Sequence, residues 1–111
     1  MDLYSEIQKQ KEDLNASIKE LRNSGTKYAQ AEKDYKIKLR IECLKLRDQG
    51  MAVTIIDKIC YGIPEVADLR FKRDVAEAVY KANLEAINSI KLQLRLLENQ
   101  IQREFGANLS D

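Results

Sequence analysis

The stretch INSIKLQLRLLENQIQREF, residues 87–105, decides the fold class of this 111-residue chain. Six of its large apolar residues follow one another at steps of three or four, which places them on one stripe of an α-helix. They are Ile87, Ile90, Leu94, Leu97, Ile101 and Phe105. The segment before it, back to Pro64, contains no further proline and no glycine. We therefore predict one helix over residues 64–105, which at 1.5 Å per residue is roughly 63 Å long. Gly106 is expected to cap it, leaving residues 107–111 as a flexible tail.

Two shorter helices are expected before it. Residues 2–22 carry apolar residues in heptad spacing, which is typical of a coiled-coil-like partner. The tract NSGT, residues 23–26, gathers residues that disfavour helix interiors and is expected to end the first helix. A second helix is predicted over residues 27–49, followed by Gly50 where a left-handed helix cap is needed.

The apolar stretch MAVTIIDKICYG, residues 51–62, is predicted to form a short helical corner. We expect a helix over residues 54–61, with Thr54 as its cap and Asp57 in a weak capping-box position. Gly62 can end it, and Pro64 suits the first turn of the next helix. We interpret the corner, marked by Val53, Thr54, Ile56, Gly62 and Pro64, as a plug at the end of a bundle. A partner-binding groove at the corner is the alternative.

These elements predict a single all-α domain: a two-helix hairpin, a short helical corner and one long C-terminal helix. The first two helices would be roughly 30 Å and 36 Å long, so a simple three-helix packing leaves about half of the long helix uncovered. Either the first two helices lie end to end along the third, or the uncovered stripe contacts another chain. We favour an oligomeric, coiled-coil-like bundle with the six stripe residues of 87–105 as its interface.

Catalytic chemistry has little support in the sequence. The chain has no histidine, which removes the commonest general base and metal ligand. The four glycines are isolated, and no phosphate-binding loop is present. Cys43 and Cys60 form no CxxC motif and are expected to be free and buried, as in a reducing cytosol. We predict a non-enzymatic protein without cofactor or metal, without a signal peptide or membrane span, located in the cytoplasm.

Charge is uneven along the chain, although its net value is only +1. Residues 24–50 carry seven basic and four acidic side chains, a net charge of +3. A patch for nucleic acid or an acidic partner would consist of Lys36, Lys38, Arg40, Arg70, Lys72 and Arg73. The alternative is a solvated face of ion pairs, which we favour. Next to these cations, the small residues of RDVAEAVY, residues 73–80, would let another helix approach closely.

Three segments resemble a known group of proteins: AEKDYKIKLRIECLKLRDQGMAVTIIDKICYG, LRFKRDVAEAVYKANLEAI and KLQLRLLENQIQREFG. Together they resemble short helical proteins encoded by phages and prophages of Gram-positive bacteria, over residues 28–106. The sequence departs from that pattern at Ala52, where proline is expected, and at Cys60.

The resemblance implies a bacterial host cytoplasm and no particular reaction. It suggests either a helper of phage DNA metabolism or a small protein that binds and disables a host factor. From the long apolar stripe and the lack of catalytic motifs, we favour an interaction protein that self-associates and binds a host or phage protein, such as a host defence or replication factor that it inhibits. The alternatives are a nucleic-acid-binding accessory of phage DNA replication or recombination, and a structural component of the virion.

Overall fold

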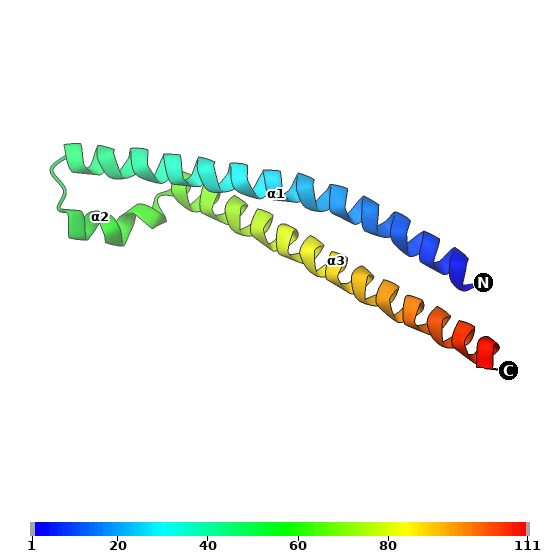
Figure 1. Cartoon of the computed structure of the whole chain (residues 1–111). Coiled ribbons are helices and arrows are strands. Elements are labelled where there is room, and N and C mark those ends of the chain that lie inside the picture. The colour runs from blue at the N-terminus through cyan, green and yellow to red at the C-terminus, as the bar shows by residue number, and fades with distance from the viewer. Residues whose placement is uncertain (1, 111) are drawn as a thin grey trace. The chain divides into compact units, whose positions relative to one another are not determined.

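The computed structural model describes residues 2–110, with side chains for residues 2–106. Its elements are α1 (Leu3–Asp48), α2 (Val53–Ile59), the 3-10 helix η1 (Cys60–Gly62) and α3 (Pro64–Ser110), as Figure 1 shows. No strand occurs within the described range. The prediction of an all-helical protein with a long C-terminal helix is therefore confirmed.

The predicted break between the first two helices is wrong, because α1 continues through residues 23–26. The covered positions of α1 keep their heptad spacing across this tract, at Leu21, Ser24, Tyr28, Ala31 and Tyr35. A residue that disfavours helix costs about 0.5–1 kcal/mol, and packing of a covered helix face can offset that cost. The expected two-helix hairpin is therefore one helix of 46 residues.

The chain divides into two compact units. Unit 1 comprises Met1–Asn23 and Lys81–Asp111, and unit 2 comprises Ser24–Tyr80. Each unit takes one segment from α1 and one from α3, and unit 2 also contains α2 and η1.

Unit 1 pairs its two segments in antiparallel fashion. A surface groove brings Gln10 beside Leu97, and a second groove brings Leu3 beside Ile101. The buried apolar residues of this unit are Ile7, Ile87 and Leu94.

This packing corrects the assignment of the 87–105 stripe to an interface between chains. Ile87 and Leu94 are buried inside unit 1, and Ile90, Leu97 and Ile101 are half-buried there. Only Phe105 remains largely exposed, at 63%. Within unit 1 the stripe is covered by the N-terminal part of α1.

Unit 2 is built around side chains from all four elements. Tyr35 of α1, Ile56 of α2, Cys60 of η1 and Val66 of α3 are all buried, and Val66 has no exposed surface. The prediction that the corner packs inward holds for Ile56. It fails for Val53, which is 55% exposed.

Two helix ends follow from their residue types. The Asp2 side chain caps α1 by accepting a 2.7 Å hydrogen bond from the Ser5 amide, which lowers the pKa of Asp2. At the other end, the Gly50 amide donates to the Arg47 carbonyl and the Met51 amide to the Leu46 carbonyl. This is the Schellman pattern, and it requires the positive φ of 84° that Gly50 adopts. The predicted cap at Gly50 is confirmed.

The remaining ends are partly as predicted. Pro64 begins α3 as expected. Thr54 is not a cap, because Ala52 precedes α2 in extended conformation and no side chain closes that end. Instead the Ala52 carbonyl accepts the amides of Ile55 and Ile56 at 3.0 Å. Gly106 does not end α3 either, since the helix continues to Ser110 through most of the expected tail. Position 111 lies outside the described residues.

Candidate interaction surface

The described residues contain neither a candidate metal cluster nor a candidate membrane span. Within residues 2–106, no three His, Cys, Asp or Glu side chains gather in a way that could hold a metal ion. None of the described helices combines the length and apolar character that a bilayer crossing requires.

Most cations of the predicted basic patch are engaged by acidic or aromatic groups of the same chain. Lys36 pairs with Glu32 at 3.3 Å, Lys38 with Glu42 at 3.1 Å, and Lys72 with Asp68 at 3.1 Å. The Arg70 guanidinium lies 5.6 Å from the centre of the Tyr61 ring. Lys45 also contacts Glu42, at 3.3 Å, and the hydrogen bonds from Lys38 and then Lys45 lower the pKa of Glu42.

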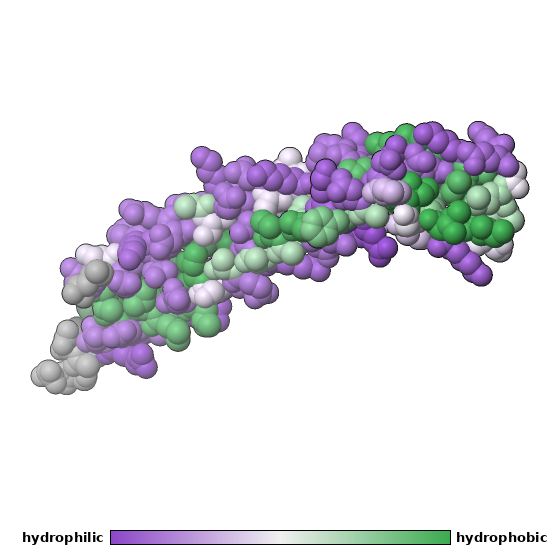
Figure 2. Space-filling model, turned by 180° about the vertical axis from the view of Figure 1, so that it is seen from behind, coloured by the Kyte–Doolittle hydropathy of each residue, from purple (hydrophilic) through white to green (hydrophobic). Residues whose placement is uncertain are grey.

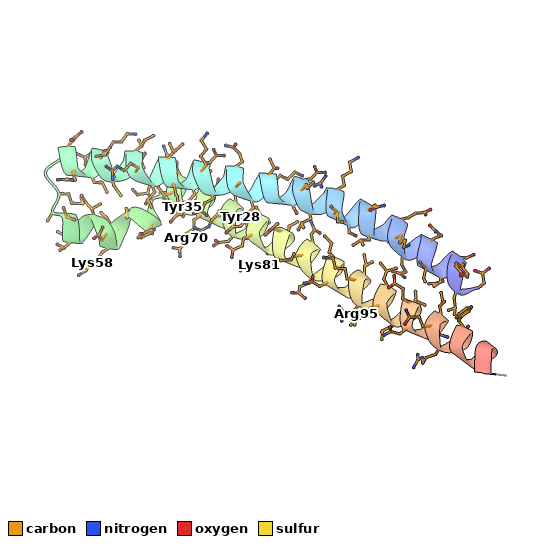
Figure 3. All side chains as sticks on the ribbon, viewed as in Figure 1. Tyr28, Tyr35, Lys58, Arg70, Lys81 and Arg95 are labelled. Atoms are coloured by element: carbon orange, nitrogen blue, oxygen red, sulfur yellow. The ribbon has the colours of Figure 1, made fainter. Side chains whose placement is uncertain are left out.

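Arg73 is the most enclosed cation of this set, with a side chain only 20% exposed. It reaches from α3 to Glu32 of α1 at 3.3 Å and to Asp74 at 2.9 Å. Its guanidinium also stands 4.7 Å from the centre of the Tyr35 ring. Figure 3 shows Tyr28 and Tyr35 on the part of α1 that lies beside α3, and the Tyr28 ring centre is 5.9 Å from that of Tyr80. These contacts join α1 to α3, so Arg73 has a structural role and is not available to phosphate.

The sixth member of the patch, Arg40, differs from the others. It lines a groove of about 350 Å³ in unit 2, together with Arg47 of α1. Within the described residues neither Arg40 nor Arg47 has an ion-pair partner within 4.0 Å. The groove therefore brings Arg40 together with Lys36 of the predicted patch and with Arg47, an arginine outside that patch.

The two cysteines, 17 positions apart in sequence, meet in unit 2. Both are free, Cys60 is buried, and Cys43 is half-buried on the wall of the same groove. Burial, followed by a hydrogen bond between the two thiols, raises the pKa of Cys43. A raised pKa reduces the thiolate fraction of Cys43 at neutral pH, which is the opposite of what activates a cysteine nucleophile.

Large apolar residues are exposed mainly on unit 2. In this unit they are Ile37, Ile41, Leu44, Val53, Ile55, Ile59, Tyr61, Phe71, Val75 and Val79. Figure 2 shows apolar patches (green) among the polar residues (purple) on the face that it displays.

Three of these residues, Phe71, Val75 and Val79, form a row on α3 that we call the α3 row. They are 66%, 46% and 47% exposed, and they border a groove of about 350 Å³ whose other wall includes Ser24 and Lys27 of α1. Sequence reasoning missed this row, although its spacing of four residues is visible in FKRDVAEAV, residues 71–79.

No protein-family model matches the chain, and no match is found among curated proteins or solved structures. The arrangement of its own side chains is therefore the basis for interpreting its function. That arrangement offers apolar and cationic surface for binding.

Proposed function

We propose that this chain is a non-enzymatic helical interaction protein that self-associates through the α3 row and binds a second protein. The observation that supports it is the exposure of Phe71, Val75 and Val79 in succession on one helix face. An exposed apolar row beside a groove is typical of a protein–protein contact.

The spacing of the α3 row suits contact between two identical copies. Phe71 and Val79 each lie four residues from Val75. If a two-fold axis passes beside Val75, Phe71 of one copy meets Val79 of the other, and the same patch serves both copies. Ala78, exposed beside the row, is small enough to let two helices approach closely.

The exposed area of the chain is large enough for contact with a second copy. The chain exposes 8284 Å², whereas a compact monomer of 12.8 kDa exposes roughly 6,300 Å². The difference of roughly 2,000 Å² for one chain exceeds the roughly 800 Å² that each partner buries in a standard protein–protein interface, so the chain has enough exposed surface for such a contact.

Analytical ultracentrifugation of Val75→Lys tests self-association. We expect the wild type to sediment as a dimer of 12.8 kDa chains and Val75→Lys to sediment as a monomer with unchanged helical content. Asn88→Lys is the matched control, because Asn88 is exposed on α3 and lies about 140° around the helix from Val75. A wild type that stays monomeric at high micromolar concentration would contradict the proposal, as would a dimeric Val75→Lys.

The resemblance to phage-encoded helical proteins extends the proposal to the partner. We propose that the partner is a bacterial host or phage protein, bound in stoichiometric amounts in the host cytoplasm. Affinity capture from a bacterial host that expresses the chain, compared with Val75→Lys, would test this. Recovery of nucleic acid without any protein would contradict it.

A further inference from the structure

We propose that the groove beside Cys43 binds an acidic amphipathic helix of a partner protein. The groove lies in unit 2, and its residues are separate from the α3 row. The inference rests on the partner-binding part of the proposed function and is independent of self-association.

The floor of the groove is aliphatic. Leu39 and Leu44 of α1 lie on one side, and Val53 and Ile56 of α2 on the other. Leu44 and Val53 are 45% and 55% exposed, so they present apolar surface at the opening, while Ile56 forms the buried base. An apolar floor between two helices suits the apolar face of a third helix.

The rim of the groove is cationic. Arg40 and Arg47 lie seven residues apart on α1, which is two helical turns on the same face. Neither has an ion-pair partner within the described residues, whereas Lys36, Lys38 and Lys72 are each paired with a carboxylate. Their charge is therefore available to carboxylates of a ligand, and the spacing matches acidic residues two turns apart on a bound helix.

The composition of the groove favours a peptide over nucleic acid. Single-stranded nucleic acid binds where bases stack on aromatic side chains. The residues lining this groove include no aromatic side chain, and one of them, Asp57, is acidic. Asp57 repels carboxylates as well as phosphate, so the carboxylates of a bound helix must lie beside the two arginines and away from Asp57.

The test uses a fluorescent helical peptide of about 18 residues, long enough to form a helix in water. The probe carries a leucine stripe flanked by glutamates. Two control peptides replace the glutamates by lysines or the leucines by serines. We expect the full-length protein to bind only the leucine–glutamate peptide, with affinity that falls as salt is raised.

Charge reversal then locates the site. Arg40→Glu combined with Arg47→Glu should weaken binding of the acidic peptide roughly tenfold or more and create binding of the lysine peptide. Leu44→Ser, at an exposed floor position, should weaken both. Both substituted positions are exposed, and we therefore expect the double variant to fold. Its helical content and melting temperature, compared with those of the wild type, check this.

Three outcomes overturn the inference. They are equal binding of the acidic and lysine peptides, no effect of the double reversal, and preference for a single-stranded oligonucleotide over the acidic peptide. Repeating the titration on Val75→Lys separates the two proposals. If monomeric Val75→Lys binds the acidic peptide, the groove inference holds independently of self-association. If the wild type is a dimer but does not bind the peptide, the groove inference is wrong and self-association is unaffected.

Discussion

Replacing Gly25 by alanine should stabilise the protein, although glycine is the residue type that predicted a break here. Gly25 lies inside α1 with an ordinary helical backbone. A Cβ atom added to it would lie 3.5 Å from Cε2 and 3.7 Å from Cδ2 of Tyr80, which is normal van der Waals contact. The substitution therefore gains helix propensity without a clash.

The expected gain is about 0.5–1 kcal/mol, the usual difference between alanine and glycine inside a helix. For a chain of this size, 1 kcal/mol raises the melting temperature by roughly 4 °C. Thermal unfolding followed by circular dichroism at fixed protein concentration measures it. The concentration must be fixed because a self-associating protein melts at a concentration-dependent temperature.

Gly50→Ala is the matched control, with the opposite expected sign. Nothing lies within 4 Å of a Cβ atom added at Gly50, so packing does not change. Its φ of 84° is unfavourable for alanine by about 1–2 kcal/mol. A Gly25→Ala variant that melts below the wild type would refute the continuous packing of α1 against Tyr80.

Four further substitutions test the core of unit 1, the contact between α1 and α3, and the N-terminal cap of α1. Leu94→Ala should lower the free energy of unfolding by about 2–3 kcal/mol, because its side chain is only 8% exposed. Leu96→Ala, at a residue that is 57% exposed, should change it by less than about 1 kcal/mol. Similar losses for the two variants in urea titrations would contradict the core of unit 1. Arg73→Ala should cost about 1–2 kcal/mol by leaving Glu32 without its partner on α3, and an unchanged urea midpoint would argue against that contact. The pKa of Asp2 is lowered in the folded state, so its charged form contributes stability above the unfolded-state pKa, and this contribution is lost as pH falls through the folded-state pKa. Asp2→Asn keeps a capping oxygen but removes this titration. On acidification below about pH 4, the melting temperature of the variant should therefore fall less than that of the wild type. Identical acid profiles would contradict the cap.

The features that could be predicted from sequence are those decided by residue type within a few positions. Pro64 begins a helix because it needs no amide donor there, and Gly50 ends one because the cap needs a positive φ. The break at residues 23–26 was mispredicted because local propensity is a weak prior. The packing of Gly25 against Tyr80 joins positions 55 residues apart and is invisible to a local pattern.

The binding surfaces could be predicted only in part, for a similar reason. A solvated face of ion pairs is predicted, and pairs such as Lys38 with Glu42 follow from a spacing of four residues. The contact of Arg73 with Glu32 spans 41 residues and removes a cation from the predicted patch. The expected break in α1 leaves two ways to cover the stripe of residues 87–105, by the same chain or by another. The choice between them depends on packing that a local sequence pattern does not show.

The most direct test of the central claim, that two copies meet at the α3 row, is disulfide trapping at position 75. In a Cys43→Ala/Cys60→Ala background, Val75→Cys should form an intermolecular disulfide under mild oxidation, because a two-fold axis beside Val75 brings the two Cβ atoms within the roughly 4 Å that such a bond requires. Asn88→Cys in the same background should remain a monomer on a non-reducing gel. Equal cross-linking at both positions, or none at position 75 at concentrations where the wild type is dimeric, would contradict the claim.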